Sequence, residues 1–361
     1  MKIVVNRLLI GYNSSIMLKP IYTITNKLLS NIKQITSIVL ELNNRRFTKV
    51  VLYELERSAR EISTYASTSI EGNPLPLTDV KQILKTQPQN LRSSEQEIIN
   101  YSKALEELNK NLQKGSIPFS LDLILSIQKQ VVDKLVPQYQ FGKLRVEPVF
   151  VNNPKAGKTV YWPPDAKDIS QLMNDLVGFT TGSKGVIDPL IIAGIFHKHF
   201  VVIHPFMDGN GRTARLSTKI LLADMGLNTF NLFSFENYYN RNVTNYFNNI
   251  GVLGNYYDIA DSIDFTNWLE YFTDGLIDEL LRVKKLLPGI TNSPKTELMP
   301  YHKKILEFIR KKGYISDRDY TKLTNRAKAT RSLDFKKLID MGLIKRSGKG
   351  RATYYQLKEN P

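Results

Sequence analysis

The sequence predicts a mainly α-helical protein with one β-hairpin and a smaller, basic domain at its C-terminal end. Apolar residues recur at helical spacing through most of the chain up to residue 287. The stretch 144–162 is instead rich in β-branched and aromatic residues around a turn-forming Asn-Asn-Pro-Lys-Ala-Gly segment, which is typical of a hairpin. Residues 295–361 contain 18 Lys and Arg against 7 Asp and Glu, so much of the positive charge is concentrated there.

Composition and proline positions divide the 361 residues into four parts. We expect an N-terminal helical region at 1–110, a central core at 111–287, a proline-rich linker at 288–300 and a C-terminal module at 301–361. Cysteine is absent, which excludes a disulfide scaffold, a thiolate metal site and a cysteine nucleophile. No apolar run has the length of a membrane helix, and the opening segment does not resemble a secretory signal. We therefore expect a soluble cytoplasmic protein without a membrane partner.

The helices are predicted from apolar spacing and from their start and stop signals. They are expected, in order, at about 25–42, 52–69, 78–85, 94–112, 120–135, 166–179, 189–203 and 211–225, with further helices to about 287. Proline at position 189 follows Asp188, which suits the first turn of a helix. His197 and His199 lie two residues apart on that helix and point in different directions, so we expect packed side chains there rather than a metal pair.

Residues 204–215, with the sequence His-Pro-Phe-Met-Asp-Gly-Asn-Gly-Arg-Thr-Ala-Arg, carry the chemistry. Gly209, Asn210 and Gly211 stand just before a helix, where close backbone approach and a helix N-terminus together suit a di- or triphosphate. Arg212 and Arg215 are three residues apart and can clamp phosphate oxygens from one face.

Two further side chains complete this set. A single carboxylate, Asp208, together with phosphate oxygens and water, is the usual way in which Mg²⁺ is held. The unperturbed pKa of a histidine, about 6.5, suits His204 to act as a general base on a hydroxyl. Base, metal ligand, phosphate cradle and two guanidinium groups within twelve residues indicate phosphoryl or nucleotidyl transfer.

This segment resembles the signature of the Fic family, H-x-F-x-[D/E]-G-N-G-R-x-x-R, with every fixed position matched, and the resemblance extends over roughly residues 45–287. It implies the Fic helical fold and transfer of AMP from ATP to a Ser, Thr or Tyr hydroxyl of a target protein, with release of pyrophosphate. It also implies that His204 is the base and that Asp208 holds Mg²⁺. The implied ATP-phosphate ligands are Gly209, Asn210, Gly211, Arg212 and Arg215.

The hairpin resembles the flap of Fic proteins, which pairs through its main chain with an extended target segment. The implied docking residues are Val149, Phe150, Val151, Val160 and Tyr161. Gly142 and Arg145, just ahead of the hairpin, also fit the family pattern.

Tyr239 and Asn242 resemble the family segment that lines the adenine pocket. Val243 and Phe247 depart from that pattern, and aromatic residues at helical spacing are equally expected in a core.

Ser67, Glu71 and Gly72 match the inhibitory motif [S/T]-x-x-x-E-[G/N] that precedes the core in many Fic proteins. The resemblance implies that Glu71 pairs with Arg215 and takes the place of the γ-phosphate. Spacing alone favours an ordinary carboxylate at a helix end for Glu71, and it is the signature at 204–215 that favours the inhibitory role.

The C-terminal module is predicted to contain helices at 302–311, 317–323 and 327–340, followed by a hairpin around a Ser-Gly-Lys-Gly-Arg turn. This order resembles a winged helix-turn-helix domain, which implies that the third helix enters a DNA major groove. The candidate DNA contacts are Arg326, Lys328, Arg331, Lys336 and Lys337, with Lys349 and Arg351 in the wing. The alternatives are protein docking and formation of a homodimer.

The leading prediction is therefore an autoinhibited protein adenylyltransferase that uses ATP and Mg²⁺. One alternative keeps the cradle but transfers phosphate, or uses another donor. The other is a DNA-binding regulator whose Fic body senses a nucleotide.

Overall fold

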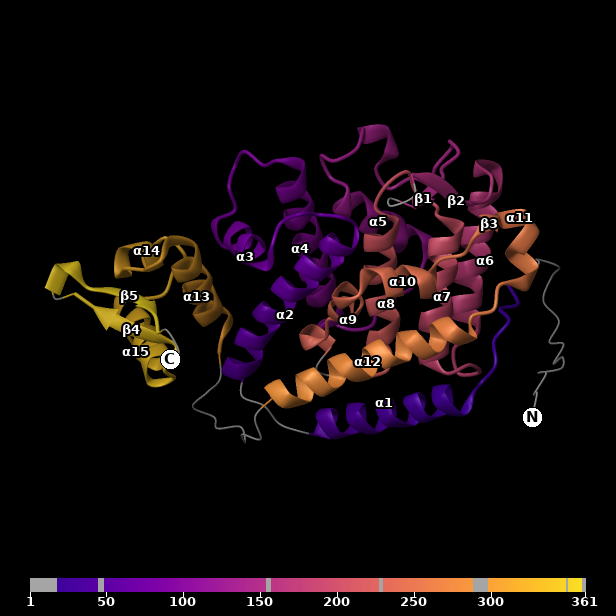
Figure 1. Ribbon diagram of the computed structural model, residues 1–361. Helices are drawn as coiled ribbons and strands as arrows, with labels where there is room; N and C mark the ends of the chain where they lie inside the picture. The colour runs from indigo at the N-terminus through magenta and orange to yellow at the C-terminus, as the bar shows by residue number, and fades with distance from the viewer. Residues whose placement is uncertain are drawn as a thin grey trace.

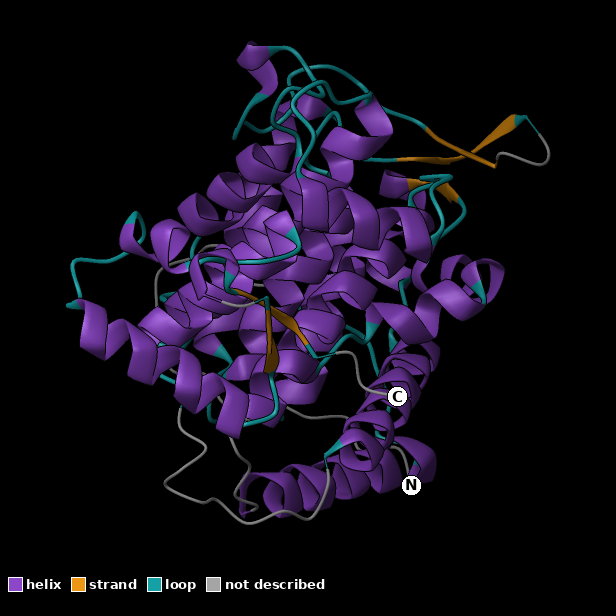
Figure 2. Ribbon diagram, turned by 90° about the vertical axis from the view of Figure 1, so that its left-hand side faces the viewer, coloured by secondary structure: helices purple, strands orange, loops and turns teal. Residues whose placement is uncertain are grey.

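A computed structural model describes residues 18–44, 49–153, 157–226, 230–287, 298–348 and 350–358. Helices form a large body, and the C-terminal module lies at one end of it (Figure 1). Seen from that end, the hairpin of β1 and β2 extends away from the helices (Figure 2). This arrangement confirms the predicted mainly α-helical fold. Within the described residues, no helix combines the length and apolar character needed to cross a membrane.

The helices of the body are α1 (Asn26–Asn44), α2 (Lys49–Ile70), α3 (Leu77–Thr86), α4 (Ser93–Leu112), α5 (Leu121–Val131), α6 (Ile169–Gly182), α7 (Pro189–Ile203), α8 (Asn210–Ala223), α9 (Glu236–Arg241), α10 (Val243–Ile250), α11 (Tyr256–Ile259) and α12 (Thr266–Leu286). The strands of the body are β1 (Val151–Asn153), β2 (Lys158–Trp162) and β3 (Gly254–Asn255). Short 3₁₀ turns lie at Gln138–Gln140, Ala166–Asp168, Phe230–Leu232, Ala260–Ser262 and Gly350–Ala352.

Helix α7 runs through the centre of the body. It begins at Asp188, whose side chain accepts a hydrogen bond from the Leu190 N–H, and Pro189 occupies its first turn. Almost every residue of α7 is buried, and the helix packs against α6, α8 and α12. Because α7 and α8 pack together, the short segment 204–209 that connects them is fixed at both ends.

Helix α2 contacts both the C-terminal module and helix α8 of the body. Its N-terminal half contributes Tyr53, whose hydroxyl accepts a hydrogen bond from Arg310 of the C-terminal module at 2.7 Å. Its C-terminal half contributes Ser67, which contacts Arg215 in α8. The helix rises about 1.5 Å per residue, so these two contacts lie roughly 20 Å apart along its axis.

The hairpin predicted at 144–162 is confirmed in its two strands. Strand β1 pairs antiparallel with β2, with Val151 opposite Tyr161 and Asn153 opposite Lys158. Strand β3 also pairs with β2, in parallel, at Tyr161 and Trp162, which was not predicted from the sequence. The turn residues 154–156 lie outside the described residues.

The C-terminal module contains α13 (Pro300–Lys312), α14 (Asp317–Thr321), α15 (Lys328–Asp340), β4 (Ile344–Ser347) and β5 (Tyr354–Leu357). Strands β4 and β5 are antiparallel, and Ile315 bridges to Tyr355 of β5. The three helices and the hairpin enclose a core of their own, which includes Ile305, Phe335 and Leu338. This order of elements is the expected one. Most of the predicted linker and Lys349 lie outside the described residues.

Candidate active site

The segment between α7 and α8 is held by its own backbone and by one amide side chain. His204 ends α7 in the left-handed region, with φ of 51° and ψ of 59°, and its N–H donates to the Phe200 carbonyl at 3.0 Å. The Asn210 side chain accepts from the Phe206 N–H at 2.9 Å and donates to the Phe206 carbonyl at 2.8 Å. In this structure Asn210 therefore shapes the loop with both ends of its amide.

The imidazole of His204 is presented in the tautomer that a base needs. Its Nδ1 lies 3.3 Å from the Val201 carbonyl oxygen, an acceptor, so Nδ1 carries the hydrogen and Nε2 keeps its lone pair. Burial lowers the pKa of His204, and the contact with Val201 opposes this shift. The neutral, proton-accepting form is therefore the form present near pH 7.

Arg145 joins the histidine to the hairpin. This buried side chain donates from Nε to the His204 carbonyl at 2.8 Å and from Nη1 to the Glu147 carbonyl at 3.0 Å. Its Nη2 donates to the Pro164 carbonyl, and its own N–H donates to the Pro205 carbonyl at 2.9 Å. One guanidinium thus ties both sides of the hairpin to the loop that carries the base.

Gln128 of α5 makes a second tie that sequence reasoning missed. Its Oε1 accepts from the Gly142 N–H at 2.7 Å, and its Nε2 donates to the Asp208 carbonyl at 3.3 Å. The side chain is 1% exposed. A glutamine on the inner side of an amphipathic helix gives no motif, and only its burial reveals the role.

The two glycines of the cradle are required by close packing. Gly209 has φ of +83°, and a Cβ atom there would lie 2.8 Å from Cγ1 of Val132. A Cβ atom at Gly211 would overlap Oε1 of Glu71. A carboxylate oxygen therefore rests directly against the backbone at the start of α8, where a phosphate oxygen of ATP would be expected to rest.

Glu71, Ser67 and Arg215 form the contact that the inhibitory motif predicts. Arg215, which is fully buried, donates from Nη2 to Oε1 of Glu71 at 2.7 Å. Its Nε donates to the Ser67 hydroxyl at 2.7 Å, and its Nη2 also donates to the Ser67 carbonyl at 2.8 Å. Nη1 is buried, lacks a hydrogen-bond partner among the described residues and faces Gly211. Burial opposes the charge of Arg215, but Glu71 holds its pKa above the ordinary value.

Arg212 is paired with two other carboxylates. Its Nη2 donates to Oδ1 of Asp208 at 2.7 Å, and its Nη1 forms an ion pair with Oε1 of Glu97 at 2.9 Å. Glu97 lies on α4 and matches no motif, so the sequence did not identify it. In this structure both guanidinium groups of the signature are occupied by carboxylates of the chain itself.

The donors present fit a divalent cation shared with a phosphate. Oδ1 of Asp208 accepts from the Gly209 N–H at 2.5 Å and from Arg212, and no described residue bonds its Oδ2. No group of three or more His, Asp or Glu side chains suited to a metal exists among the described residues. A cation here would therefore need phosphate oxygens and water as its other ligands.

The structure corrects the expectation for Tyr239. This residue is 0% exposed, stacks on Tyr246 and Tyr271, and its hydroxyl donates to the Phe272 carbonyl at 3.3 Å. No face of the ring is open to a base, because the aromatic core encloses it. Asn242 lies at the surface and caps α10, where its side chain accepts from Asn245 at 3.0 Å.

The predicted docking residues divide into two groups. Tyr161 is buried, and its hydroxyl donates to the Val202 carbonyl at 2.8 Å, so its side chain anchors the hairpin. Phe150 is 56% exposed, and Val149, Val151 and Val160 are partly exposed. Phe150 and Val149 border a pocket of about 340 Å³, which prolines and Trp162 also line.

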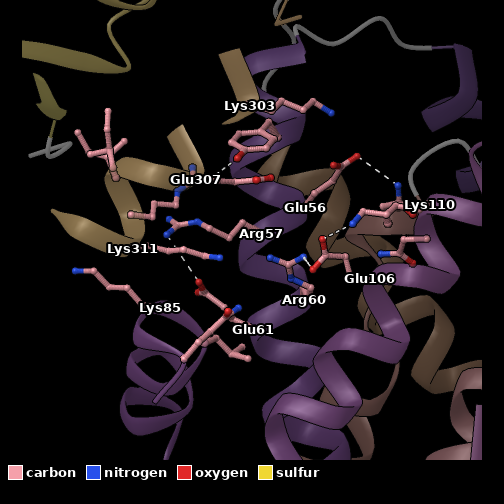
Figure 3. Close-up of a pocket in the computed structure, with 18 of the residues that line it drawn as sticks. Glu56, Arg57, Arg60, Glu61, Lys85, Glu106, Lys110, Lys303, Glu307 and Lys311 are labelled. Carbon is pink, nitrogen blue, oxygen red and sulfur yellow. Dashed lines mark hydrogen bonds and ion pairs between the residues drawn. The ribbon is translucent and has the colours of Figure 1, made fainter. Parts of the chain in front are cut away.

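A larger cleft, of about 550 Å³, lies away from the signature, between the body and the C-terminal module. Figure 3 labels charged residues of its lining, among them Glu56, Arg57, Arg60, Glu61, Lys85, Glu106, Lys110, Lys303, Glu307 and Lys311. Several of these charges pair within the cleft, as in the ion pairs of Glu106 with Arg60 and Lys110, each at 2.7 Å. The cleft is therefore lined by charges of both signs, contributed by the body and by the C-terminal module.

Some of the basic residues predicted to contact DNA form ion pairs within the C-terminal module instead. Arg326 donates to the Asp334 carboxylate at 2.9 Å, and Arg331 donates to Asp317 at 2.8 Å, so both hold the module together. Lys328 and Lys336 of α15 are exposed. The side chain of Arg351 lies outside the described residues.

His197 and His199 are packed, as predicted. His197 is fully buried between the hydroxyls of Tyr246 and Thr218, at 3.2 and 3.1 Å. His199 is 7% exposed and lies beside the Phe265 ring.

Known protein structures share this fold. A Fic family protein from Desulfovibrio desulfuricans G20 has a TM-score of 0.62 to this chain at 20% identity, covering 95% of this chain and 99% of that one. A structure of Fic-1 from Caenorhabditis elegans has a TM-score of 0.55 at 22% identity and covers 72% of each chain. The fold is therefore that of the Fic proteins.

Sequence comparison identifies the domain itself. Residues 118–222 of this chain match the Fic/DOC family. Protein adenylyltransferase fic-1 of Caenorhabditis elegans is 33% identical over 179 residues, which are 48% of this chain and 34% of that protein. Protein adenylyltransferase Fic of Nematostella vectensis is 30% identical over 166 residues, 45% of this chain and 37% of that protein. The chain thus spans little more than a third of the length of these relatives.

Proposed function

We propose that this protein transfers AMP from ATP to a hydroxyl side chain of a target protein, and that Glu71 inhibits the reaction. The observation that carries the proposal is the carboxylate of Glu71 seated between Gly211 and the buried guanidinium of Arg215. A site that holds one anionic group there, next to a neutral histidine, has the charge pattern of a phosphate site beside a base. Relatives named protein adenylyltransferases support the same reaction.

The chemical step assigned to this chain is proton removal and phosphate positioning. Nε2 of His204 accepts the proton of the target hydroxyl as its oxygen forms a bond to the α-phosphorus of ATP. The bond between that phosphorus and the bridging oxygen breaks, and pyrophosphate leaves. Arg212 and Arg215 hold the outer phosphates so that the leaving group lies opposite the attacking oxygen.

Mg²⁺ would be held by Asp208 together with phosphate oxygens, because one carboxylate oxygen has no partner among the described residues. It would neutralise charge that develops on the leaving pyrophosphate. Gly209 and Gly211 would leave room for the phosphates.

The target segment would add to the hairpin by main-chain pairing, as a further strand. Strand β2 is central, since β1 and β3 pair with it, so the outer edge of β1 is where such a segment fits best. Arg145 then places that edge in a fixed relation to His204.

The proposal is tested with purified protein, a cell lysate and ATP labelled on either the α- or the γ-phosphorus. We expect proteins of the lysate to be labelled from α-labelled ATP only. The labelling rate should be low for the unaltered chain, should rise in Glu71→Gly, and should disappear in Glu71→Gly combined with His204→Ala. Labelling from γ-labelled ATP alone would instead establish a phosphotransferase.

For the C-terminal module, duplex DNA remains the proposed partner, supported by its basic composition and by exposed Lys328 and Lys336. Binding through phosphate contacts should weaken steeply with salt. A gel shift with the full chain that shows no complex, or one insensitive to salt, would leave docking of a protein or a second copy as the role of this module.

A further inference from the structure

The turn that carries Glu71 is pinned to the body by a second set of polar contacts. Asn73 follows that turn and is 9% exposed. Its Nδ2 donates to the Ser94 carbonyl at 2.9 Å and to Oε2 of Glu97 at 2.6 Å, and its Oδ1 accepts from the Leu75 N–H at 3.1 Å. The inhibitory turn is therefore fixed to the first turns of α4.

The same Glu97 reaches the phosphate-clamping residues from its other oxygen. Oε1 of Glu97 lies 2.9 Å from Nη1 of Arg212, whose Nη2 donates to Asp208. The side chains of Glu97 and Arg212 are 15% and 5% exposed. A continuous chain of contacts thus runs from the inhibitory turn through Asn73 and Glu97 to Arg212.

The geometry points to Glu97 as a positioning residue of the inhibited state. Together with Asn73 it forms a latch that keeps the Glu71 turn in the position seen here. It also keeps Arg212 from turning toward the phosphates of ATP. This inference rests on the proposed function, because it names the regulation of that site. Glu71 occupies one arginine of the signature and Glu97 the other, from different helices.

Glu71 and Glu97 are expected to be coupled through Asn73, because Glu97 and its partner Arg212 have little access to solvent. If Arg212 turned to a phosphate, Glu97 would lose its cationic partner in a poorly solvated place, which is costly. If Glu97 shifted with Arg212, Asn73 would lose its hydrogen bond to Glu97 and keep those to Ser94 and Leu75, so the turn would be held less firmly. Entry of ATP and release of Glu71 are therefore expected to occur together.

The test uses Glu97→Gln, which keeps the shape of the side chain and removes its charge, and Asn73→Ala. Each is made in the unaltered chain and in Glu71→Gly. Glu107→Gln is the matched control, because Glu107 is exposed on the same helix and makes no ion pair among the described residues. We measure kcat and KM for ATP in AMP transfer, and thermal unfolding of each full-length variant.

With Glu71 present, Glu97→Gln and Asn73→Ala should each raise the rate at low ATP, by roughly tenfold for loss of one charge-assisted contact. In Glu71→Gly neither should raise it further, because the turn no longer blocks the site. Unchanged rates in the Glu71 background, or a rate in Glu71→Gly lowered by Glu97→Gln, would overturn the inference. The second result would mean that Glu97 holds Arg212 in its active position.

A second measurement is independent of activity. Amide hydrogen exchange of residues 71–75 should be faster in Glu97→Gln than in the unaltered chain, and unchanged in Glu107→Gln. Equal exchange in all three would overturn the latch whatever the transfer assay shows. A failure of Glu71→Gly to raise the rate, with faster exchange in Glu97→Gln, would contradict the proposed function and leave the latch standing.

Discussion

At the scale of single residues, the hydrogen-bonding state of two nitrogen atoms, one in His204 and one in Arg215, determines what the site can bind. Nδ1 of His204 faces a carbonyl oxygen and so fixes the proton on that side of the ring. Nη1 of Arg215 is buried beside Gly211 without a hydrogen-bond partner among the described residues. A buried guanidinium donor left in this way is costly, and an added phosphate oxygen would satisfy it.

The pH dependence of transfer should follow the lowered pKa of His204. Because burial lowers this pKa below 6.5, the base stays neutral at all higher pH values. In Glu71→Gly we expect a constant kcat from about pH 8 to about pH 6.5, and a fall only at lower pH. A kcat that already falls between about pH 8 and pH 7 would contradict the assignment of the base.

The absence of a side chain at Gly211 should be required both for the Glu71 carboxylate and for a phosphate of ATP to fit at this position. A Cβ atom would overlap the Glu71 carboxylate, and it would also fill the space proposed for a phosphate. Gly211→Ala should therefore fail to activate the chain, and in Glu71→Gly it should lower kcat/KM for ATP by at least about tenfold. Gly178→Ala is the control, since a Cβ atom there meets nothing within 4 Å. Full activity of Glu71→Gly with Gly211→Ala would show that phosphates do not approach this backbone.

At the scale of elements, the hairpin works as a rigid attachment of the loop between α7 and α8. Four hydrogen bonds from Arg145 reach residues 147, 164, 204 and 205, which lie on both sides of the hairpin and in the loop. Tyr161 anchors β2 to α7 through the Val202 carbonyl. The edge offered to a target and the proposed base therefore belong to one packed unit.

Replacement of Arg145 should loosen the attachment of the hairpin to the loop between α7 and α8. Arg145→Lys keeps the charge but cannot serve all these carbonyls, and each carbonyl left buried without a donor costs about 1–3 kcal/mol. We expect a Tm lower by several degrees and a kcat reduced by at least about tenfold in Glu71→Gly. Lys143→Ala, an exposed change two residues earlier, should alter neither quantity. A normal kcat in Arg145→Lys would show that the hairpin need not be rigid.

At the scale of the whole molecule, α2 contacts the C-terminal module near one end and leads into the turn that carries Glu71 at the other. Arg310 donates to Tyr53 near one end of the helix and also lies 4.7 Å from the centre of its ring. The other end carries Ser67 and leads into Glu71. The module and helix α8 thus contact the same helix, although about 95 residues separate Arg310 from Arg215 in the sequence.

Buried histidines should make the folded chain sensitive to mild acid. Burial lowers the pKa of His199 and of His302 to about 4, and it holds that of His197 well below 6.5. Unfolding restores values near 6.5, so between pH 6.5 and 4 the unfolded chain binds more protons and stability falls as pH falls. We expect a loss on the order of 2 kcal/mol per imidazole at about pH 5, measured by urea unfolding at about pH 7 and pH 5.

His199→Gln provides the check on this dependence. Glutamine cannot take up the proton, so the difference in unfolding free energy between the two pH values should shrink relative to the unaltered chain. An equal difference in both proteins would mean that His199 is protonated in the fold.

The sequence predicted those features that depend on local order. Helix α2 follows from apolar spacing, whereas the contact of Glu71 with Arg215, which joins residues 144 positions apart, was implied only by the resemblance of a short motif to the Fic inhibitory motif. Tyr239 shows the limit of prediction from the sequence, because the same spacing of aromatic residues suits a ligand pocket and a packed core. Only the stacking of Tyr239 on Tyr246 and Tyr271 in the folded chain distinguishes the two. Arg326 and Arg331 show it again, because a basic residue looks the same in a sequence whether it faces solvent or an internal carboxylate.

By itself, the sequence determined the helical class, the hairpin and the run of residues 204–215, because helix periodicity, turn residues and a contiguous signature are all encoded over short distances. Tertiary structure alone decided that Gln128, Arg145 and Glu97 meet this run. Each comes from a different segment, and their partners are mostly backbone carbonyls or buried charges. A hydrogen bond to a carbonyl leaves no trace in the identity of the residue that accepts it, so such contacts become visible only when the chain is folded.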